Sequence, residues 1–308
     1  MAPRIVSGTA NRALAEAVAA GLGGEPVPTE LDQFPDGELC PVVGAVRGDD
    51  VYVIQPTSPP LNEHVMELLL LLDACRRTGA VRVTAVVPYF GYARQDRRSR
   101  PGEPVGARVV VDMIAAAGAD RLVVVDPHTS GFEAMSSIPV ETLTATTVLA
   151  GALGSPTPHS QVVVAPDLGA VKLAERFAVQ LRLPAAAVRK VRLSGSRVRA
   201  DELAGDVNGC EAIIVDDMIS TGATIVAATG LAVARGAVSQ VVVATHGLFV
   251  GPAVDRLGNL GPRRLLVTDT VSAQVGSATE VCSIAPLLTD AIGQLHREER
   301  LDDLGLFE

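Results

Sequence analysis

Apolar, β-branched runs alternate with helical patterns along the whole chain, and this alternation constrains the fold most strongly. The runs are continuously apolar, which is typical of strands covered on both faces. Between them, apolar residues recur at three- and four-residue spacing, as expected of helices lying on a sheet. The expected strands are Val51–Ile54, Val81–Val87, Leu122–Val125, Val162–Ala165, Ala212–Val215, Val241–Thr245 and Leu265–Thr268. The expected helices include Asn62–Arg77, Arg108–Ala117, Val171–Leu181 and Ile225–Arg235. We therefore expect an α/β protein whose sheets are mainly parallel and flanked by helices.

Length and an internal repeat predict two related domains. A chain of 308 residues is long enough for two hydrophobic cores. Val123–Asp126 and Ile213–Asp216 each end a strand with a carboxylate. The stretch Gly151–Ser160 contains prolines and serines and is the least patterned, so we place the linker there. The predicted domains are residues 1–150 and 151–284, and a C-terminal helix within 285–308 is expected to pack back on the first.

Charge and cysteine content exclude several classes of protein. The net charge of −9, from 26 basic and 35 acidic residues, argues against a nucleic-acid partner. The longest apolar run, Leu68–Leu72, is too short to span a membrane. The N-terminal residues do not resemble a secretory signal, and the four cysteines are scattered without a C-x-x-C pair. We therefore expect a soluble, cytoplasmic protein without disulfides or a zinc site.

The segment Ile213–Thr224 is the sharpest local signal for a binding site. A buried strand leads into Asp216 and Asp217, and then into a short loop of small and hydroxyl residues that opens a helix. Backbone N–H groups at the start of a helix bind phosphate, and the two carboxylates could accept hydrogen bonds from sugar hydroxyls. The alternative is simple helix capping, with the acids favouring the helix dipole.

Four further segments could carry chemistry, each with a structural alternative. Four arginines between Arg94 and Arg100 could bind phosphate or stack on a base, or form a solvated loop. His128 follows a strand and could be a metal ligand or a structural hydrogen-bonding residue. Asp167 could bind metal or cap the following helix. Lys190 and Arg192 lie where basic and apolar residues alternate, which by itself favours an exposed edge strand.

Several motifs, taken in order, resemble those of the ribose-phosphate diphosphokinase (phosphoribosyl pyrophosphate synthetase) family. These motifs are Phe34–Glu38, Pro88–Arg97, Asp126–His128, Val215–Met218 and Ala244–Gly247, and the resemblance extends from Ile5 to Leu288. It implies two tandem domains of the type I phosphoribosyltransferase fold. It also implies transfer of the diphosphoryl group of ATP to the C1 hydroxyl of ribose 5-phosphate, which yields 5-phosphoribosyl 1-diphosphate and AMP.

The resemblance also implies a role for each matching residue. Phe34, Asp36 and Glu38 of a neighbouring subunit would complete an ATP site formed by Arg94, Gln95, Asp96 and His128. His128 would contact Mg²⁺, and Asp167 would contact a second Mg²⁺ near the sugar hydroxyls. Ribose 5-phosphate would contact Asp167, Asp216, Asp217, Ser220, Thr221, Gly222, Ala223 and Thr224. Lys190 and Arg192 would be catalytic cations on a flexible loop. A shared ATP site implies a homo-oligomer, dimer-based and in this family commonly a hexamer.

The chain departs from the family pattern at positions that bear on regulation. Ser220 replaces a usual aspartate, and Gly102 stands where phosphate-activated members often carry arginine. Thr129–Ser137 and the terminal residues 302–308 also differ from those members. We expect weak inhibition by ADP and little need for free phosphate. Two other functions stay open: a catalytically silent regulatory subunit of the same fold, and a phosphoribosyltransferase.

Overall fold

The computed structural model describes residues 2–129, 131–157, 159–192, 199–272 and 279–301, except for the side chains of 190–192 and 199–201. These residues form two compact units. Unit 1 comprises Met1–Ala145, Thr270–Ser272 and Ser283–Glu308, and unit 2 comprises Thr146–Asp269 and Ala273–Cys282. No helix in the described ranges is long and apolar enough to cross a membrane. Each unit is a helix-covered sheet, as the pattern of apolar runs predicts.

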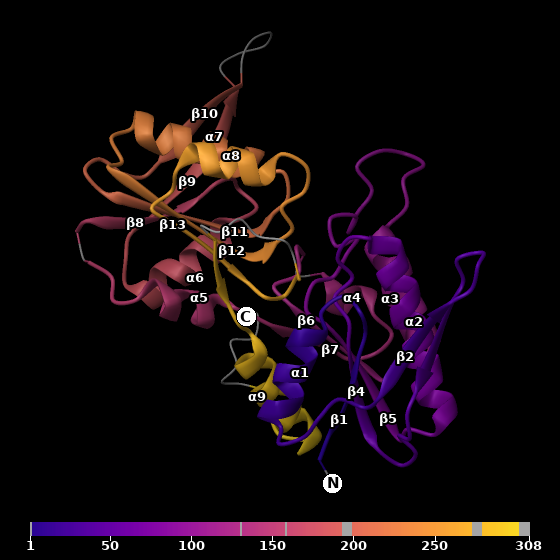
Figure 1. The fold of residues 1–308 in the computed structure, drawn as a ribbon. Coiled ribbons are helices and arrows are strands. Elements are labelled where there is room, and N and C mark those ends of the chain that lie inside the picture. The colour runs from indigo at the N-terminus through magenta and orange to yellow at the C-terminus, as the bar shows by residue number, and fades with distance from the viewer. Residues whose placement is uncertain (1, 130, 158, 193–198, 273–278, 302–308) are drawn as a thin grey trace. The chain divides into compact units, whose positions relative to one another are not determined.

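Unit 1 is built on a parallel sheet with strand order β1-β4-β5-β6-β7. Its strands are β1 (Arg4–Ser7), β4 (Asp50–Ile54), β5 (Arg82–Val87), β6 (Arg121–Val125) and β7 (Val140–Leu143). Its helices are α1 (Arg12–Gly21), α2 (Leu61–Thr78), α3 (Gly106–Ala116), α4 (Phe132–Met135) and α9 (Ala285–His296). Helices α2 and α3 cover one face of the sheet, and α1 and α9 cover the other (Figure 1).

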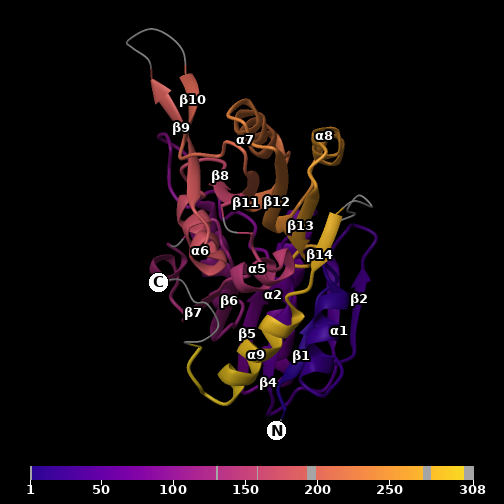
Figure 2. The ribbon, with the colours of Figure 1, turned by 90° about the vertical axis from the view of Figure 1, so that its left-hand side faces the viewer.

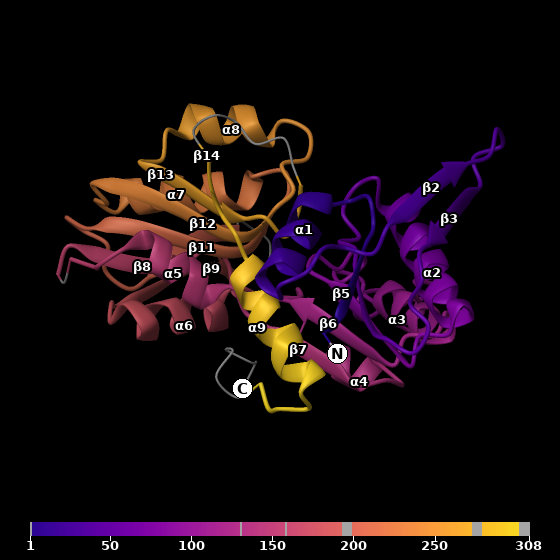
Figure 3. The same cartoon turned by 60° about the horizontal axis from the view of Figure 1, so that its bottom comes forward.

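A two-stranded arm extends from unit 1. It consists of β2 (Thr29–Gln33) and β3 (Leu39–Val43), which pair antiparallel. Strand β3 lies against α2, and the tip of the arm points away from the sheet (Figure 3). The tip is a tight turn, closed by a hydrogen bond from the Phe34 N–H to the Glu38 carbonyl.

Unit 2 has a larger sheet with strand order β10-β9-β8-β11-β12-β13-β14. Its strands are β8 (Gln161–Ala165), β9 (Ala185–Arg192), β10 (Arg199–Ala204), β11 (Glu211–Ile219), β12 (Ser239–Gly247), β13 (Arg264–Thr268) and β14 (Thr279–Cys282). All neighbours pair in parallel except β9 and β10. Helices α5 (Thr146–Leu153) and α6 (Val171–Leu181) cover one face, and α7 (Ala223–Ala234) and α8 (Ala253–Leu260) cover the other (Figures 1 and 2).

The structure differs from the sequence-based expectations at the linker and at β9. The division between the units falls after Ala145, because Thr146–Leu153 is helix α5, which packs on α6 of unit 2. The predicted linker therefore begins inside a helix. Second, β9 is not an edge strand, because β10 pairs with it along its outer side. Residues 302–308, the end of the expected C-terminal helix, lie outside the described residues.

Candidate functional site

The predicted ATP-binding residues of unit 1 follow the carboxyl ends of two neighbouring strands. Arg94 and Gln95 come after β5 and are exposed, and His128 comes after β6 and is also exposed. Asp96 links the two segments, because it interacts with Thr129 and His128, which follow β6. The pKa of Asp96 is lowered first by the hydrogen bond from the Arg97 guanidinium, and also by a hydrogen bond from Thr129 and by the charge of His128. The structure thus brings Asp96 and His128 together at one edge of the sheet, where α/β proteins bind their ligands.

The turn that carries His128 is tightly held. Asp126 is buried and adopts a φ of 37°, which is uncommon outside glycine. Its N–H donates to the Leu143 carbonyl at 2.9 Å, and its carboxylate accepts from the Ala145 N–H at 2.9 Å. Because these bonds fix the backbone on both sides of the turn, they hold the start of the Pro127–His128 segment against the end of β7.

The predicted adenine-pocket residues lie apart on the β2–β3 arm. Phe34 is 52% exposed, although burying a phenylalanine ring is favourable. Asp36 and Glu38 are exposed on the same turn, and the Glu38 N–H donates to the Asp36 carboxylate at 3.2 Å. An aromatic ring beside two acids is therefore presented to solvent at the tip of an arm.

In unit 2 the predicted ribose 5-phosphate residues form one continuous element. The sequence predicts that the strand ends at the first of the two carboxylates and a loop follows; β11 instead continues through Ile219 because β12 offers partners as far as Gly247. After Ser220, the chain turns at Gly222, whose φ of 74° suits glycine, and α7 begins at Ala223. Among the residues that the structure describes, no side chain caps the start of α7. Of the predicted loop residues, Thr221, Ala223 and Thr224 are exposed, Ser220 is half-buried and Gly222 is buried.

The start of α7 therefore resembles an anion site rather than a capped helix. Uncapped N–H groups in the first turn of a helix are available to bind phosphate. Arg256 of α8 donates to the Thr221 carbonyl at 3.0 Å, and the Val250 N–H donates to the Ser220 carbonyl at 2.9 Å. These two bonds fix the loop. The sequence pattern gave no signal for Arg256, which adds a positive charge to the loop from 35 residues away along the chain.

Three carboxylates interact electrostatically beside this loop. Asp216 is half-buried, and its pKa is raised to about 9, first by desolvation, then by the charge and hydrogen bond of Asp217 and the charge of Asp167. Asp167 follows β8, the neighbour of β11, and accepts from the Gly169 N–H at 2.8 Å and the Ala170 N–H at 3.3 Å. These bonds hold the turn before α6, whose N-cap is Ala170 without a side-chain cap bond, so Asp167 does not cap the helix; its charge also reaches Asp216.

This donor set fits a magnesium ion that keeps water or substrate ligands. Mg²⁺ prefers oxygen and is commonly held by one or two carboxylates together with waters and phosphate oxygens. Desolvation is the main cause of the raised pKa of Asp216, and the repulsion from Asp217 and Asp167 that adds to it is what a divalent cation would relieve. Among the described residues, no group of three acidic, histidine or cysteine side chains could hold a metal by itself. His128 and Asp167, the two predicted metal contacts, belong to different units.

The backbone register carries Lys190 and Arg192 to the same end of the unit 2 sheet. The last residue of β9 that pairs with β8 is Ala187, opposite Ala165, and β9 continues to Arg192 as a ribbon with β10. Lys190 and Asp167 therefore both lie just past the Ala187–Ala165 pair. The side chains of Lys190 and Arg192, and the loop residues 193–198, lie outside the described part of the chain.

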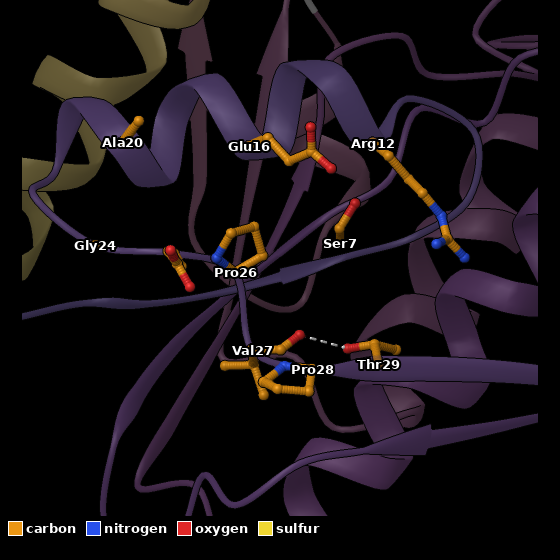
Figure 4. A pocket seen from close by; sticks show the side chains of 10 residues that line it. Ser7, Arg12, Glu16, Ala20, Gly24, Pro26, Val27, Pro28 and Thr29 are labelled. Atoms are coloured by element: carbon orange, nitrogen blue, oxygen red, sulfur yellow. Dashed lines mark hydrogen bonds between the residues drawn. The ribbon is translucent and has the colours of Figure 1, made fainter.

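A hollow of about 450 Å³ elsewhere in unit 1 contains none of the predicted site residues. It lies between α1 and the segment Gly24–Thr29, with Arg12 and Glu16 on the helix side and Pro26 opposite them (Figure 4). The candidate site is therefore not this hollow.

The fold and the matching family models define a tandem phosphoribosyltransferase-like protein. Residues 146–248 match the family model described as the phosphoribosyl transferase domain, and residues 200–306 match the phosphoribosyl synthetase-associated domain. Residues 3–118 match the N-terminal domain of ribose phosphate pyrophosphokinase.

Similar proteins identify the family within this class. The ribose-phosphate pyrophosphokinase of Aquifex aeolicus is 40% identical over 305 residues, covering 98% of each chain. That of Corynebacterium efficiens is 41% identical over 298 residues, covering 94% of this chain and 92% of its own. The crystal structure of phosphoribosylpyrophosphate synthetase from Mycobacterium smegmatis superposes with a TM-score of 0.90 at 36% identity, covering 97% of this chain and all of that one. The chain belongs to the ribose-phosphate pyrophosphokinase family.

Proposed function

We propose that this protein transfers the β,γ-diphosphoryl group of ATP to the anomeric hydroxyl of ribose 5-phosphate. The observation that carries the proposal is the β11–α7 element, where two carboxylates lead into an uncapped helix start. The helix start suits the 5-phosphate, and the carboxylates suit the ring hydroxyls. Membership of the ribose-phosphate pyrophosphokinase family supports the same reaction.

Positioning and charge neutralisation would supply most of the catalysis. The reaction joins two polyanions, so the barrier falls when the substrates are held in line and their charges are compensated. Arg94 and His128 would hold the triphosphate, and Lys190 and Arg192 would compensate the charge that develops on the transferring group. Mg²⁺ contacted by His128, and a second Mg²⁺ contacted by Asp167, would add further compensation of the phosphate charge.

The oligomer is part of the proposal. Phe34, Asp36 and Glu38 on the exposed arm would complete the ATP site of a neighbouring copy, so the active protein would be a dimer or a larger assembly of dimers. The exposed ring of Phe34 supports this arrangement. The protein would act in the cytoplasm, in keeping with cysteines that are all free thiols.

A direct assay tests the reaction. Purified protein with ATP, Mg²⁺ and ribose 5-phosphate is expected to release AMP and 5-phosphoribosyl 1-diphosphate in equal amounts. Nucleotide binding without AMP release would indicate a silent regulatory subunit. Consumption of 5-phosphoribosyl 1-diphosphate with a free base would indicate a phosphoribosyltransferase.

A mixing experiment tests the shared site. Phe34→Ala and Arg94→Ala should each be nearly inactive alone, because each would remove one half of every ATP site. Mixed oligomers should regain activity, since some interfaces then combine an intact arm with an intact Arg94. Val42→Ala, an exposed apolar position on the same arm, is the control and should stay active. Failure of the mixture to regain activity would contradict a site shared between copies.

A further inference from the structure

Thr57 is a buried residue to which the predicted site assigns no role. It lies in the loop after β4 and has no exposed surface. Its N–H donates to the Tyr89 carbonyl at 2.8 Å, and its hydroxyl donates to the same carbonyl at 3.1 Å. The hydroxyl oxygen also accepts from the Gly91 N–H at 2.7 Å. One hydroxyl can make both bonds, because it has one proton and two lone pairs.

These bonds extend the β4–β5 pairing beyond the ends of both strands. Ile54 pairs with Val86 in the sheet, and Thr57 and Tyr89 are each three residues further on. Pro56 has no N–H to continue the ladder. Beyond the end of the strand, the Thr57 hydroxyl takes the place of a backbone carbonyl, because it accepts a hydrogen bond from the Gly91 N–H.

The segment held in this way carries Arg94 and Gln95. Gly91 fits tightly, since a Cβ there would lie 2.7 Å from both the Thr57 carbonyl and Leu61 Cδ1. Tyr92 has a φ of 66°, a strained value for a bulky residue that persists only when its surroundings enforce it. Its hydroxyl donates to Asn62 Oδ1 at 2.6 Å.

The far end of the segment is fixed as well. The Gln95 N–H donates to the Tyr92 carbonyl at 2.8 Å, and the Ala107 N–H donates to the Gln95 carbonyl at 3.2 Å. The side chain of Gln95 lies against Gly106, where a Cβ would be only 2.6 Å from Gln95 Oε1. The turn is thus held by Thr57 at its start, Asn62 in the middle and the start of α3 at its end.

We propose that Thr57 is a positioning residue that sets the place of Arg94 and Gln95 for the triphosphate of ATP. This inference rests on the proposed function, in which that turn binds ATP. Thr57 has no exposed surface with which to contact a substrate, so it would act through the backbone of Tyr89 and Gly91. Because a misplacement of about 1 Å at a binding group can cost about a hundredfold in rate, removing one buried hydroxyl should be measurable in ATP binding.

The test compares three substitutions of buried threonines. Thr57→Val keeps the shape and removes the hydroxyl, and Thr57→Ser keeps the hydroxyl. Thr84→Val is the matched control: Thr84 is buried in β5 of the same unit, and its hydroxyl has no hydrogen-bond partner among the described residues. Each variant is measured for amide exchange at Gly91, for ATP affinity by calorimetry without ribose 5-phosphate, and for KM of both substrates.

Thr57→Val is expected to speed exchange of the Gly91 amide by at least about tenfold and to weaken ATP binding by about tenfold, within the range that such a displacement allows. The KM for ribose 5-phosphate should change less than about twofold, because its site lies on other elements. Thr57→Ser should restore ATP binding, and Thr84→Val should match the wild type. Tyr92→Phe, which removes only the bond to Asn62, should weaken ATP binding in the same direction if Thr57→Val does not fold.

Two results would overturn the positioning role. One is an ATP affinity of Thr57→Val that equals that of Thr84→Val. If Thr57→Val does not fold, the corresponding result is an ATP affinity of Tyr92→Phe that equals that of the wild type. The other is an equal loss for both substrates that Thr57→Ser does not rescue. A wild-type protein that binds ATP but releases no AMP would overturn the proposed reaction instead, while the binding comparison would still decide the role of Thr57.

Discussion

Asp216 is expected to lower the stability of the free protein while serving the sugar site, so Asp216→Asn should stabilise the fold and impair the enzyme. Desolvation and the charges of Asp217 and Asp167 raise the pKa of Asp216 from 3.8 to about 9. A carboxyl with a raised pKa takes up a proton on folding at neutral pH, and this uptake costs free energy. Asparagine never needs that proton, and its Oδ1 can still accept from the Asp217 N–H, as Asp216 does at 2.9 Å.

The magnitude follows from the difference between the two pKa values. Each pH unit above 3.8 costs about 1.4 kcal/mol until the folded pKa is reached, so the upper limit at pH 7 is about 4 kcal/mol. Because Asp216 is partly exposed, we expect about 1–3 kcal/mol. The sign with pH is definite: the wild type is penalised least below pH 4, and the penalty grows as pH rises toward 9.

Urea denaturation at pH 4.5 and pH 7.5 measures this effect. The advantage of Asp216→Asn over the wild type should be small at the lower pH and larger at the higher pH. Asp206→Asn is the control, since Asp206 is exposed in the same unit and its turn bond to the Asn208 N–H survives the change. The kcat/KM for ribose 5-phosphate should fall about 10- to 100-fold, because a charge-assisted bond to a hydroxyl is lost. Equal stability of Asp216→Asn and wild type at both pH values would refute the reasoning.

Three further predictions concern unit 1 and regulation. Burial alone would raise the pKa of Asp50, but hydrogen bonds from Arg82 and His296 hold it below its usual range. Asp50→Asn should therefore cost about 1–3 kcal/mol of unfolding free energy at pH 7, and urea denaturation should show that difference closing as the pH falls below the ordinary aspartate pKa of 3.8. Glu67 is buried and accepts from the Thr9 N–H at 2.7 Å, the Thr9 hydroxyl at 2.6 Å and Gln55 Nε2 at 2.7 Å. Glu67→Gln would place an amide donor against one of these donors and should cost about 2–4 kcal/mol by urea denaturation, whereas the exposed Glu63→Gln on the same helix should cost less than about 1 kcal/mol. ADP titrated at saturating Mg²⁺ and ribose 5-phosphate should inhibit weakly, and potent inhibition not relieved by ATP would contradict that expectation.

The strands and helices that carry the site were predictable because burial leaves a pattern in the sequence. The buried strands are continuously apolar, and the helices have apolar residues three or four positions apart. Val162–Ala165 and Val171–Leu181 are confirmed as the core of β8 and as α6. The continuation of β11 through Asp216 and Asp217 was not predictable, because carboxylates are unusual in a strand and only β12 shows that the pairing runs on, from Asp216 opposite Ala244 to Ile219 opposite Gly247. Gly102 stands where phosphate-activated members of the family often carry arginine. Its φ of 85° gives a local conformational reason for glycine, which the sequence alone does not show.

The contacts that hold the site in place could not be predicted from the sequence pattern. The Thr57–Gly91 bond joins residues 34 positions apart, and the Arg256–Thr221 bond joins residues 35 apart. Thr57 lies in a loop and Arg256 lies on α8, outside every segment that the sequence pattern marks as a site, and each acquires its role only when distant parts of the chain meet. Sequence reasoning could propose which side chains face the ligands. It could not show which residues fix them.

Labelled ATP gives the most direct measurement of diphosphoryl transfer. ATP carrying a label on the β-phosphorus is incubated with the protein, Mg²⁺ and ribose 5-phosphate, and the products are separated. Attack at the β-phosphorus predicts that the label leaves the nucleotide and appears in the sugar product, with unlabelled AMP. Label retained in the nucleotide as ADP would mean that only the γ-phosphoryl group moves, and the proposed reaction would be wrong.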